Sequence, residues 1–83
     1  MTAREELQRN GLFAEALQSR INALSTDFVN RDDPAQRAVI GQDRQTAIAE
    51  LARVQNEIRD LTKAIADIEE EARRAGVPPG WLR

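Results

Sequence analysis

The side chains that most often carry chemistry in proteins are absent from this sequence. Its 83 residues include no Cys and no His. Zinc fingers, thiol nucleophiles and Ser-His-Asp triads therefore cannot form. Carboxylates remain, but they act as general acids and bases only where they converge in a pocket, and a small chain with few large side chains has little material for one. We therefore expect no enzyme activity, no cofactor and no small-molecule substrate.

One group of acidic residues could be considered as a cation site. It comprises Asp27, Asp32, Asp33 and Asp43. Their spacing lacks the alternating oxygen ligands and the glycine of an EF-hand loop, and helix capping and turn formation explain them better. The run Glu69-Glu70-Glu71 is most simply a solvated acidic face. No metal site is expected.

Three arginines near the same segment raise the question of nucleic-acid binding: Arg31, Arg37 and Arg44. The net charge of the chain is −2, the aspartates interleave with these arginines, and only three aromatic residues are available for base stacking. We therefore expect a protein partner. A dimeric regulator that binds structured RNA or DNA is kept as the alternative.

The sequence has no charged and apolar signal segment at its start and no apolar run near 18 residues. We therefore expect a soluble, cytoplasmic protein that does not bind membranes. Eleven Arg against one Lys favour a bacterial or phage origin.

The elements that carry these residues are predicted to be two helices. Thr2 and Glu5 form a capping box, so a helix should span about residues 3–29. Its apolar stripe follows steps of three and four, with Asn10 as a polar member and with Leu12 and Phe13 widening it. The stripe consists of Leu7, Ala14, Leu17, Ile21, Leu24 and Phe28. Asn10-Gly11 could kink this helix, because both residues are poor helix formers.

Residues 30–33 predict a turn, and a second capping box at Asp33 and Gln36 predicts a helix over about 34–75. Gly41 could separate a short first piece of it. A glycine at 76 and two following prolines end it, leaving a tail over 77–83. Apolar residues occupy strict a and d heptad positions, which indicates a coiled-coil seam. They are Leu51, Val54, Ile58, Leu61, Ile65, Ile68, Ala72 and Ala75.

The predicted helices, roughly 27 and 42 residues, would span about 40 and 63 Å, so an antiparallel pair leaves the second helix uncovered over about Thr62 to Ala75. Three closures of this overhang are open. Two hairpins could associate, the tail could lay Trp81 and Leu82 over the seam, or another protein could insert a helix. The residues predicted to bind a partner are Leu61, Ile65, Ile68, Ala72, Trp81 and Leu82.

The sequence thus predicts an all-α, antiparallel helical hairpin with a coiled-coil seam that dimerises into a four-helix bundle. Its expected function is that of a non-catalytic protein–protein interaction module, such as a small adaptor, a chaperone-like protein or a regulator.

Overall fold

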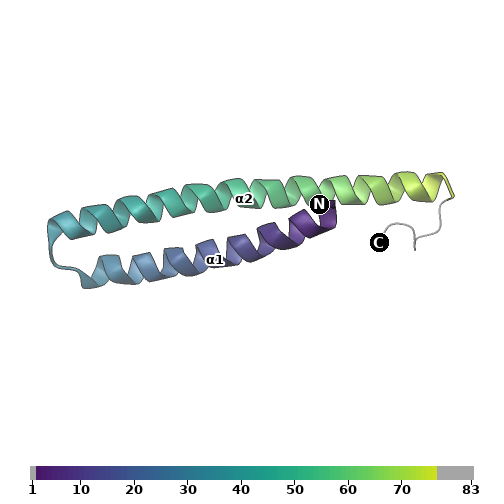
Figure 1. Ribbon diagram of the computed structural model, residues 1–83. Coiled ribbons are helices and arrows are strands. Elements are labelled where there is room, and N and C mark those ends of the chain that lie inside the picture. Colours follow the sequence, from purple (N-terminus) through teal and green to yellow (C-terminus); the bar gives the residue numbers. More distant parts are fainter. Residues whose placement is uncertain (1, 77–83) are drawn as a thin grey trace.

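The computed structural model describes residues 2–76, and it confirms an all-α hairpin (Figure 1). Helix α1 spans Ala3–Asn30 and helix α2 spans Pro34–Arg74. They lie antiparallel and are joined by residues 31–33. The molecule is a rod with extents of 64 × 18 × 15 Å. A single layer of two helices therefore has to supply the whole core.

Local chemistry sets the helix ends. The Thr2 hydroxyl accepts a hydrogen bond from the amide of Glu5 at 3.2 Å, and the carboxylate of Asp33 accepts from the amide of Ala35 at 3.0 Å. Both bonds satisfy amides that the first helical turn leaves unpaired. Gly76 ends α2 with a φ of 77°, the left-handed region that favours glycine. The predicted N-caps of both helices and the C-terminal glycine are confirmed.

The core is short and lies in the middle of the rod. Its buried members are Leu17, Ile21, Ala47, Leu51 and Val54, and Ala14, Leu24, Ile48 and Ile58 pack against them. Val54 is the most deeply buried, at 1% exposed. The predicted stripe of α1 faces this core, because each of its members is buried or half-buried.

Leu12 and Phe13 do not extend the buried stripe as expected. Leu12 is 62% exposed and Phe13 is 43% exposed. Phe13 lies one position before Ala14 on the helix, so it points to one side of the interface rather than into it.

The breaks predicted at Gly11 and Gly41 do not occur, because both helices run through these residues without interruption. Asn10 is held by a 3.4 Å hydrogen bond from its Nδ2 to Glu57 Oε2 on the other helix. Gly41 faces the ring of Phe28, and a Cβ added there would lie 3.3 Å from Phe28 Cε2. Contacts between the helices outweigh the poor intrinsic propensity of these residues.

Helix α2 is longer than α1, with 41 residues against 28. As predicted, α2 extends past the start of α1 (Figure 1), although the uncovered part is shorter than Thr62 to Ala75. Leu61 and Ala64 share a groove with Glu6 of α1, and Arg4 forms an ion pair with Glu69 at 2.5 Å. At the other end, α2 begins slightly beyond the last turn of α1, and residues 34–39 are all exposed (Figure 1). Most of the excess length lies at the C-terminal end of α2, and a smaller part lies at the turn, where α2 starts beyond the last turn of α1 (Figure 1).

Within residues 2–76, neither helix is sufficiently apolar over sufficient length to cross a membrane.

Candidate protein-interaction face

One side of the hairpin carries two open grooves that meet at Phe13. The first groove extends from Phe13 toward the start of α1, and its lining includes Glu6, Arg9, Asn10, Arg53, Val54, Glu57, Asp60, Leu61 and Ala64. The second groove extends from Phe13 toward the turn, and its lining includes Ala16, Leu17, Arg20, Asp43, Thr46, Ala47 and Glu50. We call this side, with Phe13 at its centre, the Phe13 face. Apolar surface predominates in both grooves.

The heptad of α2 explains the apolar patch in the first groove. Glu occupies the g position at 50, 57 and 71, whereas position 64 carries Ala. The small Ala64 side chain follows Leu61 by three residues, so the two lie on the same side of the helix. Ile68, one turn beyond Ala64, is 53% exposed. The polar row is thus interrupted where apolar side chains reach the surface.

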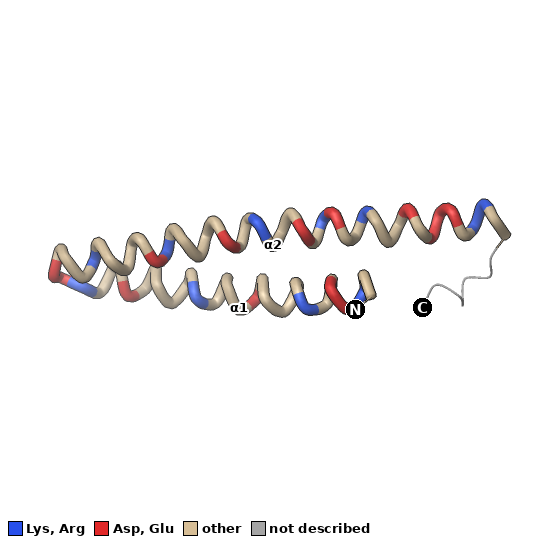
Figure 2. Tube along the Cα trace, turned by 45° about the horizontal axis from the view of Figure 1, so that its top comes forward, with Lys and Arg blue, Asp and Glu red and all other residues tan. Residues whose placement is uncertain are grey.

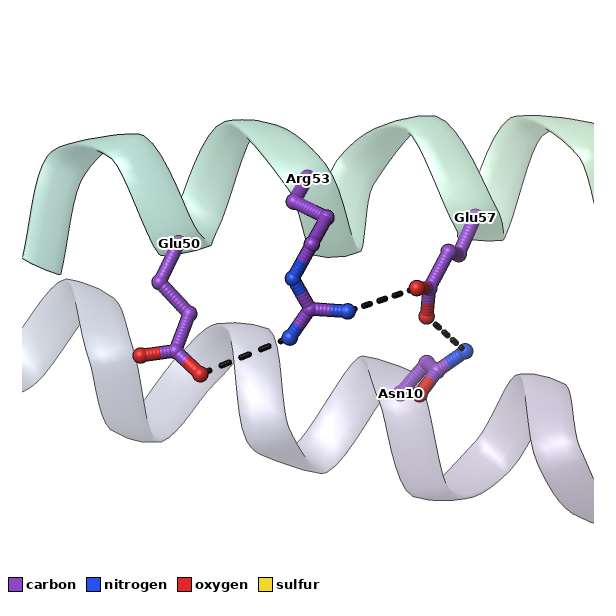
Figure 3. Close-up of polar contacts among 4 residues, drawn as sticks. All are labelled: Asn10, Glu50, Arg53 and Glu57. Atoms are coloured by element: carbon purple, nitrogen blue, oxygen red, sulfur yellow. Dashed lines mark hydrogen bonds and ion pairs between the residues drawn. The ribbon is translucent and has the colours of Figure 1, made fainter.

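A polar network crosses between the helices and includes residues of both grooves (Figure 3). Arg53 lies between two carboxylates of its own helix, with Nη1 at 2.6 Å from Glu57 Oε1 and Nη2 at 3.4 Å from Glu50 Oε1. Glu57 also accepts from Asn10 of α1. The bond between Asn10 and Glu57 links this network to α1, while the side chain of Arg53 remains 57% exposed.

Some charges of the Phe13 face form no ion pair. No salt bridge to Glu6, Arg20 or Asp60 is found between residues 2 and 76, and all three are exposed. Figure 2 shows both signs of charge interspersed along both helices. The face therefore offers separate positive and negative groups beside apolar grooves.

Beyond the grooves, the end of α2 is rich in acidic residues, and several of them form ion pairs. Glu70 pairs with both Arg73 and Arg74, at 2.5 and 3.4 Å. Glu69 contacts Arg4 of α1. Lys63 donates to Asp67 at 2.7 Å, and this hydrogen bond, followed by the charge of Asp67, raises the pKa of Lys63 above its ordinary value.

The three arginines near the turn make contacts inside the hairpin. Arg37 donates to the carbonyl of Phe28 at 3.2 Å and lies over the Phe28 ring. Arg44 donates to Ser25 Oγ at 2.8 Å, and Arg31 donates to Gln36 at 3.5 Å. The expected role of Asp33 as a helix cap is confirmed. Across residues 2–76, no group of three acidic side chains is arranged to hold a metal ion.

The residues predicted to bind a partner do not form one uniform surface. Leu61 lies in the first groove, Ile65 and Ala72 are half-buried, and Ile68 is exposed. Trp81 and Leu82 lie outside the described residues. The sequence reading missed Phe13 and Ala64 as surface residues. The signal for Ala64 was present in the interrupted g row, while Phe13 could not be separated from the neighbouring core position Ala14 by spacing alone.

No known protein family, curated protein or solved structure matches this chain significantly. The interpretation of the face therefore depends on its physical properties.

Proposed function

We propose that the chain is a non-catalytic protein–protein interaction module whose hairpins associate with one another into a four-helix bundle. The observation that best supports this proposal is that only five residues of the described hairpin form the buried core, while large apolar residues such as Phe13 and Ile68 are exposed. A chain of this size with so small a core has marginal stability, and without disulfides or a structural metal self-association is the remaining aid.

The accessible surface supports a partner of substantial size. The chain exposes 6357 Å². A compact monomer of 9.3 kDa would expose about 5,000 Å². A specific interface of standard size buries about 800 Å² on each partner, so an excess of about 1,400 Å² on one chain is ample surface for one. A second hairpin of the same length can cover such a surface, and its outer polar faces would then be available to a further protein.

Sedimentation equilibrium tests this function over a range of micromolar concentrations. We expect twice the chain mass of 9.3 kDa, with dissociation only on dilution. A single-chain mass throughout the range would contradict the proposal.

A matched pair of variants adds a second test. Ile68→Asp should shift the equilibrium toward monomer, because a charge would enter an apolar contact. Lys63→Asp, on a side chain that is 77% exposed, should leave the mass unchanged. Equal behaviour of the two variants would contradict an interface at Ile68.

Binding of structured RNA or DNA is the alternative that the sequence leaves open. No specific contact favours it, because the arginines near the turn bond within the hairpin and acidic side chains alternate with them. An electrophoretic mobility shift at two salt concentrations discriminates the functions, since phosphate contacts weaken steeply as salt rises.

A further inference from the structure

We infer that a second copy of this chain docks on the Phe13 face, about a twofold axis that passes beside Phe13 perpendicular to the long axis of the rod. This inference rests on the proposed self-association and adds its geometry. In such a dimer, α1 lies antiparallel on α1 of the partner, and α2 lies antiparallel on α2. Closed twofold dimers are the commonest assemblies of identical chains.

The charges of α1 fit this axis. Glu6 and Arg20 each lie seven residues from Phe13, one before it and one after it. The same side of the helix carries all three, because Glu6 and Phe13 line the first groove and Phe13 and Arg20 line the second. Rotation about Phe13 therefore brings Glu6 onto Arg20 of the second copy, and Arg20 onto its Glu6. Neither residue has an ion pair among residues 2–76.

The charges of α2 fit the same axis independently. Between the ends of the rod, residues that face each other across the two helices have numbers that add up to 67–69, as in Asn10 with Glu57 and Ser25 with Arg44. Phe13 therefore lies across from residues 54–56. On α2, Arg53 comes before these residues and Asp60 comes after them, and both line the first groove. The twofold axis thus brings Asp60, which has no ion pair within the described range, near the exposed Arg53 of the second copy.

The shape of the face agrees with the charges. Because the two grooves meet at Phe13, the rotation places the first groove of one copy over the second groove of the other. Exposed Ile68, beyond the first groove, then lies near Thr46 and Ala47 of the second copy. Apolar side chains meet apolar surface, and unpaired charges meet opposite charges. A dimer formed through the C-terminal ends of two α2 helices would instead bring Glu69, Glu70 and Glu71 close to the same residues of the second copy, and these like charges would repel.

Charge reversal tests the axis. Glu6→Arg and Arg20→Glu should each weaken the dimer about tenfold or more, because each creates two like-charge contacts. The double variant with both changes in one chain restores opposite charges and should recover most of the affinity. Glu5→Arg is the matched control, since Glu5 is exposed in the same first turn but lines neither groove. Dissociation constants from sedimentation equilibrium give the comparison.

Cross-linking provides a second measurement that does not depend on charge. The chain has no Cys, so Phe13→Cys introduces one thiol per copy next to the axis. We expect rapid formation of a disulfide-linked dimer on mild oxidation. Val29→Cys, at a side chain that is 76% exposed near the turn, should form little.

The outcomes separate the two proposals. A wild-type protein that is monomeric throughout would overturn the proposed function and this inference together. A wild-type dimer in which Glu6→Arg weakens association no more than Glu5→Arg, and in which Phe13→Cys cross-links no faster than Val29→Cys, would overturn the twofold axis at Phe13 and leave self-association standing.

Discussion

At the scale of single residues, the two glycines inside the helices have different environments. An added Cβ at Gly11 would meet nothing within 4 Å, whereas one at Gly41 would lie 3.3 Å from the ring of Phe28. Phe28 is held from the other side by Arg37, whose guanidinium lies 4.6 Å from the ring centroid. Gly41 therefore provides the space in which this ring packs.

Replacing each glycine with alanine tests this difference. Gly11→Ala should raise the free energy of unfolding by about 1 kcal/mol, because alanine is the better helix former. Gly41→Ala should gain less or lose stability, since the ring of Phe28 must move. Urea denaturation at one fixed protein concentration measures both. Equal gains at the two positions would show that Phe28 does not pack on Gly41.

Lys63 makes alkaline stability unusually simple to interpret. The chain has one Lys and no Tyr, Cys or His, so no other side chain titrates between about pH 9 and 12. The hydrogen bond to Asp67 and then its charge raise the pKa of Lys63 above 10.5. Its contribution is therefore fully present below the unfolded pKa and is lost as pH rises through the folded pKa.

We expect a small decline in the free energy of unfolding above pH 10.5 and no such decline in Lys63→Gln. Urea denaturation at several alkaline pH values checks this. A variant that declines as much as the wild type would assign the effect to other groups.

At the scale of the helices, the ends could be predicted because each depends on a few neighbouring residues. Thr2, Asp33 and Gly76 act through their own side chains or backbone freedom, so they are readable from sequence. The division of the excess length of α2 could not be predicted in this way. It depends on the path of residues 31–33 and on contacts between distant residues, such as Arg4 with Glu69.

Capping provides a test at this scale. Asp33→Ala should lower the free energy of unfolding by about 1 kcal/mol, because the amide of Ala35 loses its acceptor. Asp32→Ala is the matched control, since Asp32 is exposed and does not cap α2. Thermal unfolding followed by circular dichroism compares them. A larger loss at Asp32 would place the start of α2 elsewhere.

At the scale of the whole molecule, the rod is far more elongated than a compact domain. Its radius of gyration is 19.0 Å, while a compact domain of this length has about 12 Å. The heptads at Leu51 and Val54 correctly indicated the core, because a and d positions face a neighbouring helix. The heptads do not predict the Phe13 face. This face lies beside the seam, so its apolar residues follow a weaker heptad pattern, and it includes polar residues such as Glu6 and Arg20.

The twofold dimer about Phe13 can be tested with a mixture of the two single variants Glu6→Arg and Arg20→Glu. Native mass spectrometry measures which dimers the mixture contains. In a homodimer of either variant, both contacts between positions 6 and 20 join like charges. In a mixed dimer, both contacts join opposite charges. We expect the mixed dimer to predominate well beyond its statistical share. A statistical distribution of the three dimers would contradict it.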